Sequence, residues 1–129
     1  GAPAKRINLS YLEPAFYLLC ATVVLGGALA LPYLRVIARR LPWPLRAAHG
    51  VSGTAALATL FWALYRGLPP SAMGTAGFGP ASAVFIGLAL LLGLAIVLFR
   101  VRPPGVLVAF HAGLAITGFV VLWTVVSLG

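Results

Sequence analysis

The sequence predicts an all-α integral membrane protein, a four-helix up-down-up-down bundle built from two tandem helical hairpins with pseudo-two-fold symmetry. Three observations lead to this fold class. Apolar residues make up 62% of the 129 residues, and the mean hydropathy is +1.09. Charged residues account for only 8%, which is too little polar surface to cover a water-soluble globule. Finally, the chain contains four apolar runs long enough to span a bilayer, and their only charged residue is Arg46, at the start of the second run.

The four runs extend over residues 15–34, 45–65, 81–99 and 106–128, within a single four-span domain covering residues 1–129. Prolines stand shortly before the last three runs, at Pro42, Pro44, Pro80, Pro103 and Pro104. Proline favours the first turn of a helix and opposes helix continuation upstream, so each of these runs is predicted to begin a new helix. Residues 67–80 form the longest connection, and residues 1–10 are expected to form a short polar tail.

A shift of 62 residues superposes the second run on the fourth. The matched pairs are Arg40 with Arg102, Pro42 with Pro104, Leu45 with Leu107, Ala47 with Ala109, His49 with His111, and Leu60 with Leu122. The first and third runs share length and glycine content but show no comparable register. We therefore expect two repeat halves, at about 11–66 and 79–129, related by an axis along the membrane normal.

The distribution of basic residues predicts an orientation, because cytoplasmic loops of membrane proteins are rich in lysine and arginine. Six arginines flank or occupy the first and third connections: Arg35, Arg39, Arg40, Arg46, Arg100 and Arg102. Three basic residues lie on the other side: Lys5, Arg6 and Arg66. We expect an inner membrane of a bacterium, with both termini outside. The lipid bilayer is then the immediate partner, and the sparse charges offer no surface for nucleic acid.

The two histidines of the chain fall at matching depth in two runs that cross the membrane in the same direction. Such runs are diagonal neighbours in an up-down bundle, so His49 and His111 can face each other across its axis. Small residues on the same faces are expected to leave room for a cofactor: Ser52, Gly53, Ala56, Ala115 and Gly118. Arginines stand at the same end: Arg46, Arg102 and Arg40. This pattern suits haem b, with the histidines as axial ligands of the iron and the arginines paired with the propionates.

In this arrangement the sequence resembles the small four-helix b-type cytochromes, among them the cytochrome b561-like proteins. The resemblance rests on the four-span layout and on the placement of His49 and His111. It implies one haem that carries single electrons at the cytoplasmic side, with a quinone as a candidate partner. Cytochrome b561-like proteins have further histidines for a second haem, and this chain has none.

Composition excludes most catalytic chemistries. The single cysteine, Cys20, excludes an intramolecular disulfide and a cysteine-based zinc or iron–sulfur site. The single carboxylate side chain, Glu13, excludes paired-carboxylate catalysis, and no aspartate is present for a Ser-His-Asp triad. We therefore expect no catalytic residues, and electron transfer at most.

Other functions remain open at this point. One is a cofactor-free accessory or scaffold subunit of a larger respiratory or photosynthetic complex, with other membrane subunits or further copies of this chain as partners. Another is a small transporter or channel in which the histidines titrate, although the runs hold few polar residues to line a wet path. In the simplest alternative, each histidine bonds a backbone carbonyl, a hydroxyl or a lipid headgroup without any cofactor.

Overall fold

The computed structural model describes residues 9–36, 38–39, 41–66, 77–98 and 105–128. Most of these residues belong to four α-helices: α1 (Leu9–Ala30), α2 (Trp43–Arg66), α3 (Phe78–Leu98) and α4 (Gly105–Leu128). No strand occurs in the described ranges. Each helix is long and apolar enough to cross a membrane. The all-α class is therefore confirmed, and the four helices are compatible with an integral membrane protein.

Most helix ends lie close to their predicted positions, and α1 differs most. Both α2 and α4 begin and end within two residues of the predicted runs. However, α1 begins at Leu9, whereas the apolar run begins at Ala15, so it takes in the last residues of the expected polar tail. Pro14 lies near the start of this helix, where it removes only one backbone hydrogen bond. Most of the connection expected at 67–80, and Phe99 at the end of the third run, lie outside the described residues.

A Schellman motif follows α1. The Val36 N–H donates to the Leu31 carbonyl at 3.0 Å, and the Arg35 N–H donates to the Pro32 carbonyl at 3.2 Å. This pair of bonds requires a residue in the left-handed region, which is usually glycine. Arg35 occupies that position with a φ of 59°. The first run was predicted to continue to Leu34. The apolar residues 31–34 belong instead to the turns that follow the end of α1 at Ala30.

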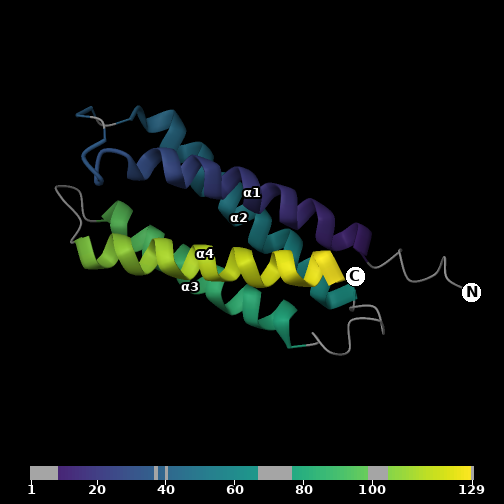
Figure 1. Cartoon of the computed structure of the whole chain (residues 1–129). Helices are drawn as coiled ribbons and strands as arrows, with labels where there is room; N and C mark the ends of the chain where they lie inside the picture. Colours follow the sequence, from purple (N-terminus) through teal and green to yellow (C-terminus); the bar gives the residue numbers. More distant parts are fainter. Residues whose placement is uncertain (1–8, 37, 40, 67–76, 99–104, 129) are drawn as a thin grey trace, which may run out of the picture.

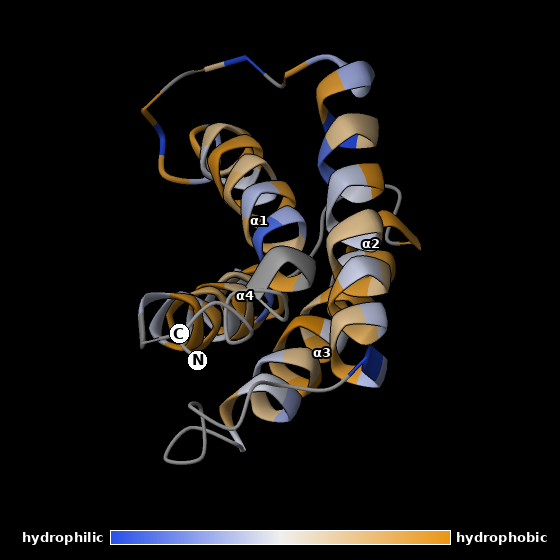
Figure 2. Cartoon of the chain, turned by 90° about the vertical axis from the view of Figure 1, so that its right-hand side faces the viewer, coloured by the Kyte–Doolittle hydropathy of each residue, from blue (hydrophilic) through white to orange (hydrophobic). Residues whose placement is uncertain are grey.

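The helices pack as two hairpins that lie against each other (Figure 1). The most extensive contacts join α1 to α2 and α3 to α4, and smaller contacts join α1 to α4 and α2 to α3. Thus α2 and α4 contact the other two helices more than they contact each other. Large apolar residues are exposed on all four helices, as expected for helices that contact lipid. Hydrophobic residues occur along the whole length of the ribbons (Figure 2).

Burial is concentrated at one end of the helices. The buried residues are Leu12, Ala15, Leu19 and Thr22 of α1, Ala56, Leu57, Leu60 and Ala63 of α2, Gly79, Ser82, Ala83, Ile86 and Ala89 of α3, and Gly118, Leu122 and Val125 of α4. We call the opposite end, formed by the described residues of 23–55 and 90–117, the open end. None of the described residues there is buried. It is the end at which α1 leads into α2 and α3 into α4, on the left in Figure 1.

Candidate functional site

The two histidines meet between the hairpins, at the boundary between the packed core and the open end. The ring centroids of His49 on α2 and His111 on α4 are 6.0 Å apart, and the ring planes make an angle of 82°. Both side chains are half-buried. The structure therefore brings the two predicted ligands together, one from each hairpin.

Each histidine is anchored by one ring nitrogen to the other helix of its hairpin. His49 Nδ1 lies 2.9 Å from the Thr22 carbonyl oxygen of α1, and His111 Nδ1 lies 2.6 Å from the Ala89 carbonyl oxygen of α3. A carbonyl oxygen can only accept a hydrogen bond, so Nδ1 carries the proton in both rings. In a neutral imidazole the lone pair for a metal or another donor is then on Nε2. No described residue is hydrogen-bonded to either Nε2 atom.

A glycine lies under each ring. A Cβ atom built on Gly26 of α1 would be 2.8 Å from His49 Cε1, and one built on Gly93 of α3 would be 2.9 Å from His111 Cε1. Each glycine lies four residues after the residue whose carbonyl accepts the Nδ1 hydrogen bond. The carbonyl and the glycine therefore form one notch on the first helix of each hairpin, and the imidazole of the second helix fits into it.

Three of the small residues expected to face a cofactor contact the other helix of their hairpin. The Ser52 hydroxyl is 2.8 Å from the Thr22 hydroxyl, and a Cβ on Gly53 would lie 3.2 Å from Thr22 Cγ2. A Cβ on Gly118 would be 2.7 Å from Ile86 Cγ1, so this glycine allows α3 and α4 to approach closely.

The remaining predicted site residues lie in three different kinds of surroundings. Ala56 belongs to the buried core, and Ala115 is half-buried. Arg46 is exposed near the start of α2, one helical turn before His49. Arg40 and Arg102 lie outside the described residues.

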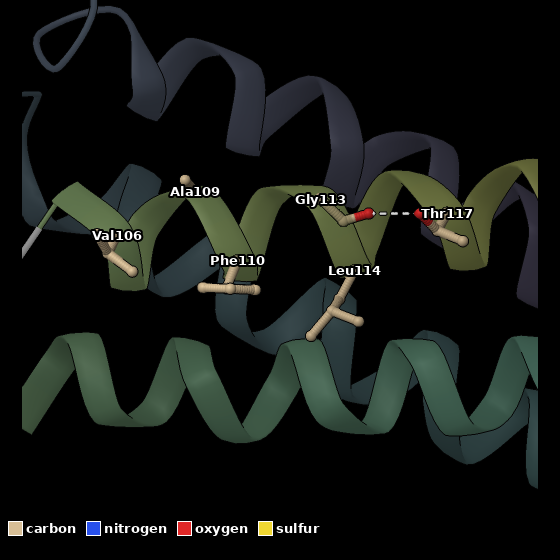
Figure 3. A pocket seen from close by; sticks show the side chains of 6 residues that line it. All are labelled: Val106, Ala109, Phe110, Gly113, Leu114 and Thr117. Atoms are coloured by element: carbon tan, nitrogen blue, oxygen red, sulfur yellow. Dashed lines mark hydrogen bonds between the residues drawn. The ribbon is translucent and has the colours of Figure 1, made fainter.

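A shallow groove on α4 lies apart from this site (Figure 3). It is lined by Val106, Ala109, Phe110, Gly113, Leu114 and Thr117. Its lining is mostly apolar, and the Thr117 hydroxyl already donates to the Gly113 carbonyl at 2.7 Å. The groove therefore offers no polar group for orienting a ligand.

The number of side chains at the site that can bind a metal limits which metal-containing groups it could hold. Within the described part of the chain, no cluster of three or more His, Cys, Asp or Glu side chains is present to hold a bare metal ion. Structural zinc needs four protein ligands, and catalytic zinc three. A haem iron already has four porphyrin nitrogens and needs only the two axial ligands. Two imidazoles with Nε2 atoms not used in hydrogen bonds are too few for a zinc site made by the protein alone, and they match the number of axial positions of a haem iron.

Comparison with known proteins identifies no relative: no family model, no curated protein and no solved structure matches this chain.

The glycine notches were not predicted as part of the site. Gly26 and Gly93 do not coincide under the 62-residue shift that relates the second and fourth runs, so the repeat did not single them out. A shift of 67 residues places Gly26 on Gly93, Leu25 on Leu92 and Ala28 on Ala95. His49 follows Gly26 by 23 residues, whereas His111 follows Gly93 by 18, so the two pairs of helices need shifts that differ by five residues. A separate alignment of the first and third runs therefore contains the signal.

Proposed function

We propose that this protein is an electron-transfer subunit of a membrane, with one haem b held between His49 and His111 at the open end. The separation of the two rings is the observation that carries this proposal. Metal–imidazole bonds of about 2.0–2.1 Å place the centroids of two opposed axial imidazoles about 6 Å apart. The two centroids here are 6.0 Å apart.

The open end supports the same assignment. On the open-end side of the two histidines, none of the described residues is buried. A flat macrocycle held between the two imidazoles would lie between the hairpins and extend into this part of the molecule. Arg46 is exposed at this end, and we assign it, with Arg40 and Arg102, to the propionates. Of the small residues predicted to face the group, Ser52, Gly53 and Gly118 instead contact the other helix of their hairpin, and Ala56 lies in the buried core, which leaves Ala115.

The chain's own residues would set the properties of the bound group. When bound, haem supplies an iron that gains or loses one electron. The Thr22 and Ala89 carbonyls hold the two Nδ1 protons, which orients the rings and raises the basicity of Nε2. The apolar helices limit access of water. The presence of two similar hairpins, each contributing one histidine, supports the pseudo-two-fold arrangement. We propose a quinone or further membrane subunits as the electron donor or acceptor.

An absorption spectrum of the purified protein tests this function. We expect a Soret band in the oxidised protein and a sharp α-band after reduction with dithionite. Both should be lost in His49→Ala and in His111→Ala, because each substitution removes one axial ligand. Thr54→Ala on α2 and Thr117→Ala on α4 are the matched controls, since their hydroxyls bond only to their own helix, at Gly50 and Gly113.

A colourless wild-type protein from haem-replete cells would exclude this function. Co-purification of that colourless protein with a larger assembly would then favour the cofactor-free accessory subunit. Proton flux in liposomes that depends on His49 and His111 would favour the transporter.

A further inference from the structure

We propose that Gly26 and Gly93 are positioning residues that fix the two axial ligands in mutually perpendicular planes. The proposal rests on the haem function proposed above and extends it to two residues that contact no cofactor. Each glycine acts through the imidazole that lies on it. The two notches together would determine the ligand geometry of the iron and how firmly haem is retained.

The space next to each glycine is too small for a methyl group. A methyl group on Gly26 would be 2.8 Å from His49 Cε1 and 3.3 Å from Nδ1. Carbon atoms in normal contact are about 3.5–4.0 Å apart, so the ring would have to move away from α1. That movement stretches the 2.9 Å hydrogen bond from Nδ1 to the Thr22 carbonyl and displaces Nε2. Functional constellations tolerate displacements of only about 0.5 Å.

The second hairpin repeats these contacts with different neighbours. A methyl group on Gly93 would be 2.9 Å from His111 Cε1 and 3.3 Å from Nδ1, close to the values for Gly26. The carbonyl that accepts the Nδ1 hydrogen bond belongs to Ala89, again four residues earlier. The same notch thus occurs in two helices whose other side chains differ, which indicates that the site depends on the notch itself.

Neighbouring glycines do not share this property. A Cβ on Gly27 of α1 or on Gly87 of α3 would have no atom of another described helix within 4 Å. Gly27→Ala and Gly87→Ala therefore add the same methyl group to the same helices without touching a histidine. They are matched controls for Gly26→Ala and Gly93→Ala.

The angle between the rings provides a readout that a purely structural role would not move. The two ring planes meet at 82°. Perpendicular axial imidazole planes give low-spin ferric iron a far more anisotropic electron paramagnetic resonance signal than parallel planes do. We expect this strongly anisotropic signal in the wild-type protein and in both control variants.

The experiment measures haem per chain and the ferric resonance spectrum of the four variants in mild detergent. In Gly26→Ala and Gly93→Ala we expect haem retention to weaken by about 10-fold to 100-fold, as for other partners that orient metal ligands. We also expect the anisotropic signal to change in the haem that remains. Wild-type haem content and an unchanged signal in both variants would overturn the proposal while leaving the haem function intact. A wild-type protein without haem would overturn both.

A double variant covers the case in which Gly26→Ala does not accumulate. Removing the ring removes the clash, so Gly26→Ala/His49→Ala should accumulate as well as His49→Ala alone. If the double variant is also lost, Gly26 is required for something other than the imidazole, and the proposal is wrong. The pair Gly93→Ala/His111→Ala gives the same test in the second hairpin.

Discussion

At the scale of single residues, the surroundings of the two histidines differ in polarity. Beside His49, the Thr22 hydroxyl lies 2.8 Å from the Ser52 hydroxyl, which donates to the His49 backbone carbonyl at 3.1 Å. In the second hairpin, Ala89 provides the equivalent carbonyl, and Leu114 takes the place of Ser52 in the repeat. Among the described residues, a hydroxyl pair therefore lies beside His49 but has no counterpart beside His111, so the surroundings of the two histidines are not equivalent.

Thr22→Val should destabilise the protein by about 0.6 kcal/mol, and by no more than about 1.7 kcal/mol, the range found for hydrogen bonds between membrane helices. Valine keeps the shape of threonine and loses only the hydroxyl that reaches Ser52. The measurement is unfolding by sodium dodecyl sulfate in mixed micelles. Thr54→Val is the control, because the Thr54 hydroxyl is exposed and bonds only to its own helix. Equal losses in the two variants would show that the bridge between α1 and α2 contributes nothing.

The sequence predicts the histidine pair but not how each ring is held. His49 and His111 were found because the 62-residue repeat puts them in register and because ionisable residues within membrane spans are rare. The notches at Gly26 and Gly93 depend on a backbone carbonyl, which any residue provides, and on the absence of a side chain. The carbonyl leaves no mark in the sequence, and the two glycines come into register only when the first and third runs are aligned with the 67-residue shift.

At the scale of elements, composition determined the helices better than their ends. Apolar length located all four helices, because a span must be both long and uncharged. The start of α1 was misplaced, since the apolar run begins only at Ala15, whereas the helix begins at Leu9 and includes Glu13 and Pro14. The Schellman motif after α1 was also missed, because Arg35 stands where glycine normally occurs.

Arg35→Gly should be more stable than Arg35→Ala by about 1 kcal/mol, the cost of placing a Cβ atom in the left-handed region. Both substitutions remove the charge near the end of α1, so their difference isolates the φ of 59° at this position. Detergent unfolding of the two variants measures it. If the alanine variant is as stable as the glycine variant, the left-handed turn does not constrain this residue.

At the scale of the whole molecule, the two hairpins are packed together at one end only. The contacts within each hairpin are more extensive than those between hairpins. The buried residues that do join the hairpins, such as Leu19, Leu60 and Leu122, all lie away from the open end. The packing within each hairpin follows from the apolar runs and their small residues. The incomplete packing at the other end could not be predicted, because no sequence pattern distinguishes a helix face that meets lipid from one that meets a cofactor.

The orientation in the membrane remains a prediction that reporter fusions can test. Six arginines around the first and third connections favour placing the open end at the cytoplasmic side. Alkaline phosphatase fused after Gly129 should then be active, and green fluorescent protein at the same position should be dark. The reverse pattern would place both termini in the cytoplasm and the histidines near the outer surface.

The uneven packing of the two hairpins has a consequence for assembly. The buried contacts between the hairpins lie on the far side of the histidines from the open end. Under the proposed haem function, the group would enter from the open end, so loading should follow membrane insertion as a separate, reversible step. A chain inserted during haem starvation should then acquire haem later, when supply returns.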